Sequence, residues 1–402
     1  MTQTKMKTQN NPVPTVHRSM AERLSNELRF VPVAVGLILL FVFFSTQSDV
    51  FLSSRNLNNL LVQSTVTGII ALGLVFVLLV GEIDLSVAAT SGVCAVLMAM
   101  LVVDSGLPVP LAICIAILAG MLIGAAAGRW ITLIGVPSFV VTLGFGLMLN
   151  GLQLLLLPNT GRYNLLNTGV EKIAATYISG IAAWLLVLSV IAIFFYIRHT
   201  THQTRIRVGL NTSWGSSVVL PVSVVAITLI VLLLFLEQLR GLPMPAILFL
   251  SLLGIMSYIA GETRFGLSLY AIGDNAEAAS RAGINVNRVK IIAFSIAGGL
   301  AAFGGILSAS RILGVSVSSG GGVGGGALLL ESIAAAVIGG VSLFGGRGMV
   351  IGALFGALII ATVSNGLNLM GVANEARLII TGLLLVLAVS VDRIIDNFAS
   401  SQ

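Results

Sequence analysis

Two carboxylates, Glu82 and Asp84, stand between long apolar runs in the segment LLVGEIDLSVAAT. Ionised groups in apolar surroundings are costly unless they line a cavity, have partners or lie at a helix end. A helix that begins near Ser86 would point its amide donors at Asp84, which would then act as a cap. The pair could therefore cap a broken helix, contact a translocated polar solute, or bind protons or cations.

Nucleotide chemistry can be tested through the lysines. A Walker A loop needs a lysine directly after a glycine, so that backbone amides and one ammonium group hold the phosphates. None of the four lysines follows a glycine: Lys5, Lys7, Lys172 and Lys290. Any ATP and Mg²⁺ chemistry must therefore lie on another polypeptide.

Catalytic and metal chemistry has equally little support. The three histidines lie in polar segments, so no Ser/His/Asp or Cys/His set can be assembled around them. His199 and His202 have no third ligand nearby, and Cys94 and Cys114 lie inside apolar runs. The glycines within 320–326 match G-x-G-x-x-G, but the acidic residue expected about 20 positions later is missing. We expect no catalytic residue, cofactor site or metal site on this chain.

The composition identifies the elements that must position these residues. The chain has 402 residues, of which 57% are hydrophobic and only 9% are charged, whereas soluble domains have about 25% charged residues. A membrane helix needs about 20 apolar residues. The intervals between charges predict helices at about 31–47, 62–81, 86–103, 109–133, 139–157, 178–197, 218–236, 244–260, 289–310, 328–343, 350–370 and 377–394. We predict an all-α integral membrane protein, a polytopic bundle of about 10–12 transmembrane helices with a broken or re-entrant helix after Asp84.

The basic residues indicate the sidedness. With the N-terminus in the cytoplasm, 15 of the 21 lysines and arginines fall on the cytoplasmic side, as the positive-inside rule requires. The other six fall outside: Arg55, Arg162, Lys172, Arg240, Arg311 and Arg377. We therefore expect both termini in the cytoplasm, a cytoplasmic tail at 1–29 and a single transmembrane domain at 30–397. Loops are expected at 158–177 outside, and at 198–217 and 261–288 in the cytoplasm.

The loop at 261–288 contains a short run of helix-forming residues, AEAASRA, from Ala276 to Ala282. Asp274 or Asn275 can cap its start, and Gly283 can stop it. A short cytoplasmic helix between two breaks is suited to docking a partner protein.

Several polar residues inside the predicted helices could line a path for a polar solute. They are Glu82, Asp84, Ser86, Asn150, Gln153, Ser364, Asn365 and Asn368. Hydrogen bonding between helices is an equally good interpretation of the amide and hydroxyl residues among them.

Three motifs resemble the branched-chain amino acid and monosaccharide permeases of bacterial ABC importers. They are EIDLSV at Glu82–Val87, YAIGDNAEAASRAGINV at Tyr270–Val286 and ESIAAAVIGGVSLFGG at Glu331–Gly346. The match runs from about residue 55 to the C-terminus. Glu82, an inserted segment around 158–240 and LPMP at Leu242–Pro245 are most similar to the longer xylose-type permeases.

The resemblance implies a homodimeric permease in the bacterial inner membrane that moves a monosaccharide, such as the pentose xylose. A cytoplasmic ABC ATPase would hydrolyse ATP, and a periplasmic sugar-binding protein would deliver the sugar. The family's coupling helix falls on Gly273, Asn275, Glu277, Ala278, Ala279, Arg281, Gly283 and Ile284.

Two other functions remain open from the sequence alone. One is a proton-coupled secondary sugar transporter that uses Glu82 and Asp84, and the other is a non-catalytic membrane scaffold or channel. The net charge of +6 is explained by sidedness, so we expect the lipid bilayer, and no nucleic acid, as a partner.

Overall fold

A computed structural model describes residues 30–390, except 208, 210–212, 322–326, 374, 384–385 and 388–389. The predicted tail at 1–29 lies outside the described residues. The helices are α2 (Phe30–Gln47), α3 (Ser54–Leu79), α4 (Val87–Val103), α5 (Val109–Ile134), α6 (Ser138–Leu156), α7 (Lys172–Ala175), α8 (Ile181–Arg207), α9 (Leu220–Glu237), α10 (Met244–Glu262), α11 (Arg264–Asp274), α12 (Ala276–Arg281), α13 (Val286–Ile312), α14 (Ala327–Ile338) and α15 (Gly352–Leu369). A π-helix, η1 (Gly215–Val219), leads into α9, and a 3₁₀ turn, η2 (Ser319–Gly321), precedes α14. Short strands are β1 (Arg162–Asn164), β2 (Tyr177–Ile178), β3 (Leu242–Pro243) and β4 (Gly314–Ser316), paired antiparallel as β1–β4 and β2–β3.

Eight helices in the described part of the chain are long and apolar enough to cross a membrane. Three shorter apolar helices accompany them, in α2, α4 and α14. The predicted all-α polytopic membrane bundle is therefore confirmed.

Helices α3 and α13 form the centre of the bundle. In the most apolar window of α3, 89% of the residues are buried, and α13 packs along both α3 and α5. The contact between α5 and α13 depends on small residues, since a Cβ atom at Gly124 would overlap the carbonyl oxygen of Phe294. Close backbone approach of this kind is the usual way in which membrane helices associate.

The predicted helix break after Asp84 is present. Helix α3 ends at Leu79, an irregular segment follows, and α4 begins only at Val87. Most residues of α4 are buried, between α13, α5 and α6. This short helix thus lies inside the bundle, and its first turn faces other protein elements.

Two stretches predicted to be loops are largely helical. Helix α8 continues to Arg207, and threonine hydroxyls of its polar end bond to carbonyl oxygens four residues earlier, as Thr200 does to Tyr196 at 3.0 Å. The 261–288 segment contains the predicted short helix, α12, and also an unpredicted helix, α11, capped by Thr263, whose side chain accepts the amide hydrogen of Gly266. Polar sequence at 198–207 and 264–274 therefore does not mean an irregular backbone.

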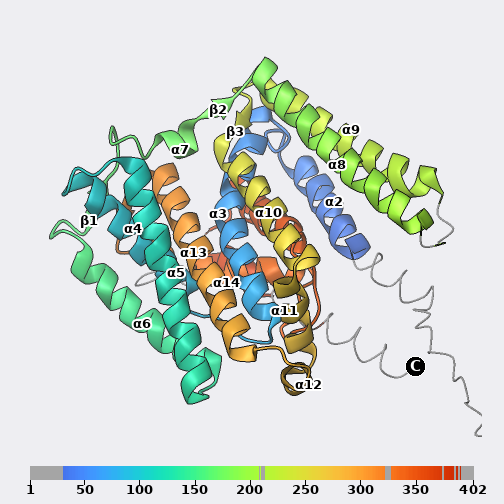
Figure 1. Cartoon of the computed structure of the whole chain (residues 1–402). Helices are drawn as coiled ribbons and strands as arrows, with labels where there is room; N and C mark the ends of the chain where they lie inside the picture. Colours follow the sequence, from blue (N-terminus) through green and yellow to red (C-terminus); the bar gives the residue numbers. More distant parts are fainter. Residues whose placement is uncertain are drawn as a thin grey trace, which may run out of the picture.

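The two ends of the bundle carry different structures (Figure 1). Helices α11 and α12 lie at one end, called here the α12 end, and α7 with β1, β2 and β3 lies at the other, called the α7 end. At the α7 end the Tyr163 hydroxyl donates a hydrogen bond to the Asp104 carboxylate. The Ala174 amide donates to the Ser310 hydroxyl at 2.9 Å. The segment predicted as an outside loop at 158–177 is therefore held by side chains at the ends of α4 and α13.

Candidate functional site

Helix α12 has the features of a docking element. The Asn275 Oδ1 atom accepts a hydrogen bond from the Ala278 amide at 2.9 Å, which is the predicted N-cap. Gly283 has a φ of +87°, a left-handed conformation that favours glycine as a helix stop. Glu277 and Arg281 pair at 2.6 Å on the exposed face, with 76% and 78% of their side chains exposed. A salt bridge so exposed contributes little to stability, so these charges are available to a partner.

The buried side of α12 is small and apolar. Ala279 is only 5% exposed, and Ile284 packs against the main hydrophobic core. Ala278 is exposed beside Glu277. Among the predicted coupling residues, Ala279 and Ile284 therefore anchor the helix in the bundle, whereas Asn275, Glu277, Ala278, Arg281 and Gly283 are exposed.

Four glycines join α11 to the rest of the bundle, and we call them the glycine junction: Gly81, Gly273, Gly345 and Gly346. A Cβ atom at Gly273 would overlap the Leu79 carbonyl oxygen and the Gly346 amide nitrogen. These two atoms also form a hydrogen bond of 3.0 Å. The end of α11, the end of α3 and the turn before α15 therefore meet backbone to backbone.

The side chain of Tyr270 strengthens this meeting point. Its hydroxyl donates a hydrogen bond to the Gly348 carbonyl at 3.0 Å. Burial raises the pKa of the Tyr270 phenol, so the hydroxyl keeps the proton that it donates. Gly348 belongs to the turn that leads from α14 to α15, so α11 is fixed to that turn by a side chain as well.

Glu82 and Asp84 have different partners. Glu82 forms an ion pair with Lys290 of α13, and both side chains are largely buried. The Asp84 Oδ1 atom accepts hydrogen bonds from the Ser86 amide at 2.8 Å and from the Ser86 hydroxyl at 2.6 Å. Asp84 thus orders the turn just before α4, but it does not cap the helix: the N-cap residue is Ser86, and α4 has no side-chain cap hydrogen bond.

Asn150 lies at a small cavity beside the first turn of α4. The cavity has a volume of about 140 Å³. Its lining comes from α4, α6, η2 and α14: Leu85, Ala88, Ala89, Leu143, Gly146, Leu147, Asn150, Gly320, Gly321 and Leu329. The Asn150 Oδ1 atom is buried there and has no hydrogen-bond partner among the residues that the structure describes. An unpaired buried oxygen beside an opening is able to accept a hydrogen bond from a polar solute.

Gln153, one turn further along α6, holds the segment that follows β4. Its Nε2 atom donates to the carbonyl oxygens of Ser316 and Ser319, each at 3.0 Å. A Cβ atom at Gly92 of α4 would overlap the Gln153 Oε1 atom. The side chain therefore fixes the chain that enters residues 322–326, which lie outside the described residues.

The remaining path candidates lie away from this cavity. Asn365 and Asn56 exchange two hydrogen bonds of 2.9 Å between α15 and α3. The exposed Asn368 accepts a hydrogen bond of 3.1 Å from Arg377. Interhelical bonding explains Asn365 fully, whereas Asn150 is the amide that lines an opening.

Sequence reasoning missed three parts of this site: Lys290 as the partner of Glu82, the anchoring role of Gln153, and the glycine junction. The pairing with Lys290 could have been found from the sequence, because a carboxylate between apolar runs needs a cationic partner. The glycines at 345 and 346 stood inside a quoted motif, but their contacts are not encoded locally.

Comparisons with known proteins show the family of the chain. A family model described as "Branched-chain amino acid transport system / permease component" matches residues 56–389. The xylose transport system permease protein XylH of Escherichia coli (strain K12) is 36% identical over 311 residues, which cover 77% of each chain. XylH of Haemophilus influenzae is 35% identical over 319 residues, or 78% of this chain and 83% of the relative.

A more distant relative carries a different printed substrate. The autoinducer 2 import system permease protein LsrC of Salmonella typhi is 28% identical over 306 residues, or 76% of this chain and 68% of the relative. No solved structure matches the chain.

Proposed function

The chain belongs to the family of branched-chain amino acid transport system permease components, and we propose that it is the membrane subunit of an ATP-binding cassette importer for a monosaccharide. The XylH relatives support a pentose such as xylose as the solute. The single observation that carries the proposal is α12, an exposed, capped helix in the family's coupling position. We place the protein in the bacterial inner membrane, as one permease unit over 30–397 with cytoplasmic termini.

The proposed ATPase partner docks on α12 in the cytoplasm. The exposed Glu277 and Arg281 offer both charges to it, while Gly273 makes contact with the end of α3. A push on α12 would therefore reach α3 through backbone atoms, which cannot rotate out of the way. ATP hydrolysis takes place on the partner in this scheme.

The proposed solute path uses the cavity at Asn150 together with a second copy of the chain. The cavity of about 140 Å³ is smaller than the roughly 300 Å³ of the smallest usual ligand pockets. Leu147 in its lining is 68% exposed, so the cavity opens at the outer surface of α6. Polar groups that face lipid are costly, and a second copy on this surface would enclose Asn150 and complete the path.

The proton-coupled alternative has less support. Glu82 is paired with Lys290, and Asp84 is bonded to Ser86. A carboxylate that carries a transported proton must lose and regain it during each cycle. Both candidates instead have structural partners, which favours the importer.

The test is reconstitution in proteoliposomes with the ATPase and the secreted sugar-binding protein encoded beside this chain. We expect uptake of radiolabelled xylose that requires ATP and the binding protein, and a panel of other monosaccharides tests the sugar. The Glu277→Ala/Arg281→Ala variant should lose sugar-stimulated ATP hydrolysis, whereas Arg205→Ala, an exposed control in α8, should retain it. Uptake without ATP that a protonophore abolishes would refute the importer and favour the alternative.

A further inference from the structure

Helices α8 and α9 form a hairpin at the side of the bundle (Figure 1). They pack mainly on each other, and α9 reaches α3. In the most apolar 18-residue stretch of each of these two helices, only 11% of the residues are buried, whereas 89% are buried in the corresponding stretch of α3. The hairpin thus contributes little to the core, and its role must lie elsewhere.

The end of the hairpin that meets the bundle is tightly organised. The Ser54 hydroxyl donates to the Gln238 Oε1 atom at 3.1 Å, and the Asn58 amide donates to the Gly241 carbonyl at 3.5 Å. The Glu237 carboxylate accepts from the Gly180 amide and the Trp184 indole, at 2.9 and 3.2 Å. The first two bonds fix the hairpin end against the first turns of α3, and the Glu237 bonds join the end of α9 to the start of α8.

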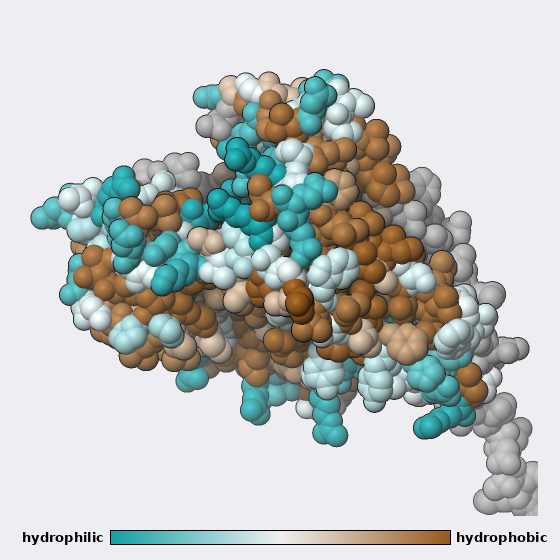
Figure 2. Space-filling view, turned by 90° about the horizontal axis from the view of Figure 1, so that it is seen from above, coloured by the Kyte–Doolittle hydropathy of each residue, from teal (hydrophilic) through white to brown (hydrophobic). Residues whose placement is uncertain are grey.

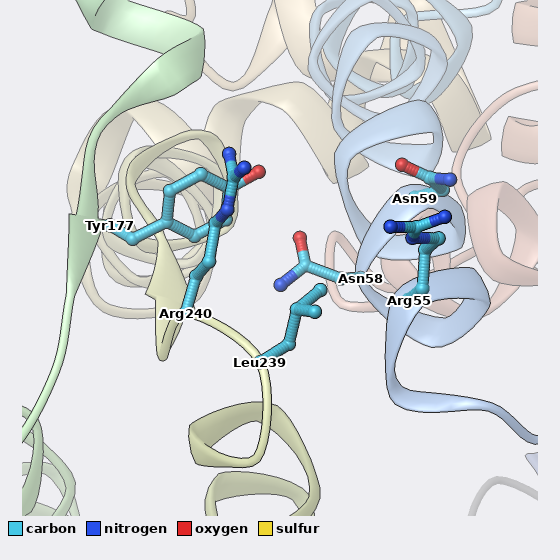
Figure 3. Close-up of a pocket in the computed structure, with 6 residues that line it drawn as sticks. All are labelled: Arg55, Asn58, Asn59, Tyr177, Leu239 and Arg240. Atoms are coloured by element: carbon cyan, nitrogen blue, oxygen red, sulfur yellow. The ribbon is translucent and has the colours of Figure 1, made fainter.

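A polar pocket of about 240 Å³ lies at this seam (Figure 3). We call it the arginine pocket, and its lining is Arg55, Asn58, Asn59, Tyr177, Leu239 and Arg240. Figure 3 shows Arg55 on the α3 side and Arg240, beside the Tyr177 ring, on the hairpin side. The Arg240 guanidinium lies 5.8 Å from the centre of that ring, a cation–π contact that helps to hold it in place.

The pocket holds two arginines that form no ion pair within the described part of the chain. The Glu237 carboxylate, three residues before Arg240, accepts its hydrogen bonds from the Gly180 amide and the Trp184 indole. Arg55 also lies in the first turn of α3, where the helix dipole adds further positive potential. Two guanidiniums beside amide donors are suited to carboxylates, which they can bind through paired hydrogen bonds.

The pocket opens at the α7 end, which the sidedness of the basic residues predicts to face the periplasm. Seen from above this end, hydrophilic residues gather in the middle of the surface and towards one side, next to broad hydrophobic areas (Figure 2). Guanidiniums can also donate hydrogen bonds to sugar hydroxyls, but two of these charges together are complemented best by carboxylates. A protein that docks on this face and presents acidic side chains would supply them.

We propose that the arginine pocket receives acidic side chains of the sugar-delivery protein, and that the α8–α9 hairpin is a recognition arm for this partner. The inference rests on the proposed function. The hairpin supplies Arg240 and Leu239, and the strand before it supplies Tyr177, so about half of the pocket belongs to the inserted segment. Permeases without this segment would lack that half.

The test measures binding of the fluorescently labelled delivery protein encoded beside this chain to the permease–ATPase complex in nanodiscs. We expect Arg55→Glu and Arg240→Glu each to weaken binding at least about tenfold, as reversal of a contact charge at an interface does. The control is Arg162→Glu, an exposed reversal at the same end but outside the pocket, which should leave the affinity unchanged. Added salt should lower the affinity of the wild-type complex for the delivery protein more than it lowers the affinity of the Arg55→Glu/Arg240→Glu variant.

Repeating the measurement in neutral and in anionic lipid separates the sources of negative charge. An arginine effect of equal size in both lipids supports acidic side chains, whereas an effect seen only in anionic lipid would overturn the proposal in favour of a lipid headgroup. Unchanged binding by Arg55→Glu/Arg240→Glu would overturn it as well. If the wild-type complex imports sugar with ATP and the double variant binds normally, only this inference fails, whereas failure of the wild type to bind or import refutes the proposed function.

Discussion

Replacing Gly273 by alanine adds one methyl group at the point where α11 meets the rest of the bundle. The new Cβ atom would overlap the Leu79 carbonyl oxygen and the Gly346 amide nitrogen and would lie 2.9 Å from the Gly346 Cα atom. All three are backbone atoms, so no side-chain rotation relieves the overlap. The end of α11 must move away from α3, or α3 and the turn before α15 must move.

The energetic cost follows from two opposing effects. Extra methyl groups in well-packed sites cost about 1–3 kcal/mol, and contact with backbone on two sides places this one at the upper end. Alanine gains about 1 kcal/mol over glycine within a helix. The net cost is therefore about 2 kcal/mol, which corresponds to a roughly 30-fold smaller population of the native junction.

The assay is sugar-stimulated ATP hydrolysis by the reconstituted importer, together with thermal unfolding of the purified permease. We expect Gly273→Ala to lower both the stimulated rate and the unfolding midpoint. The matched control is Gly261→Ala in α10, because a Cβ atom there has no neighbour within 4 Å, and this variant should keep wild-type activity. Wild-type coupling and stability in Gly273→Ala would refute the reasoning, because the methyl group would then have found space that the structure lacks.

Two further predictions concern the segment before α4. Lys290→Met leaves the Glu82 carboxylate without its partner, and we expect the free energy of unfolding to fall by about 1–3 kcal/mol. The Glu82→Gln/Lys290→Met variant should recover part of this loss. Additive effects in a double-mutant cycle measured by thermal unfolding would contradict the pairing. Asp84→Asn keeps a neutral acceptor oxygen for the Ser86 amide in place of a charged one, so we expect a cost of about 1 kcal/mol with substantial uptake. Complete loss of uptake in a stable Asp84→Asn protein would instead assign the charge a direct role in transport.

Local features of the fold could be predicted from the sequence. The helix break after Asp84, the Asn275 cap and the Gly283 stop each depend on residues within a few positions of one another, and all three are present. Hydropathy located the apolar helices but not their polar extensions. Helix α8 continues to Arg207, and α11 occupies a stretch predicted as loop, because backbone hydrogen bonding continues where apolarity ends.

The parts of the site that depend on distant residues could not be predicted in the same way. Glu82 and Lys290 are 208 positions apart, and the two walls of the arginine pocket come from α3 and the end of α9. The sequence assigned Arg55 and Arg240 to one side of the membrane, but only the fold brings them to one pocket. Sidedness therefore gives the face of the molecule on which a residue lies, and packing gives its neighbours.

These contacts give a continuous physical route from α12 to the cavity at Asn150. The glycine junction joins α11 to the end of α3, and Gly81 is directly followed by Glu82, which is tied to α13 through Lys290. Helix α4 begins five residues after Glu82, at Val87, and its first turn lines the cavity. Along this route the contacts at the junction are between backbone atoms, which deform little, and the next link is an ion pair between two largely buried side chains. A displacement of α12 is therefore expected to reach the first turn of α4 with little loss.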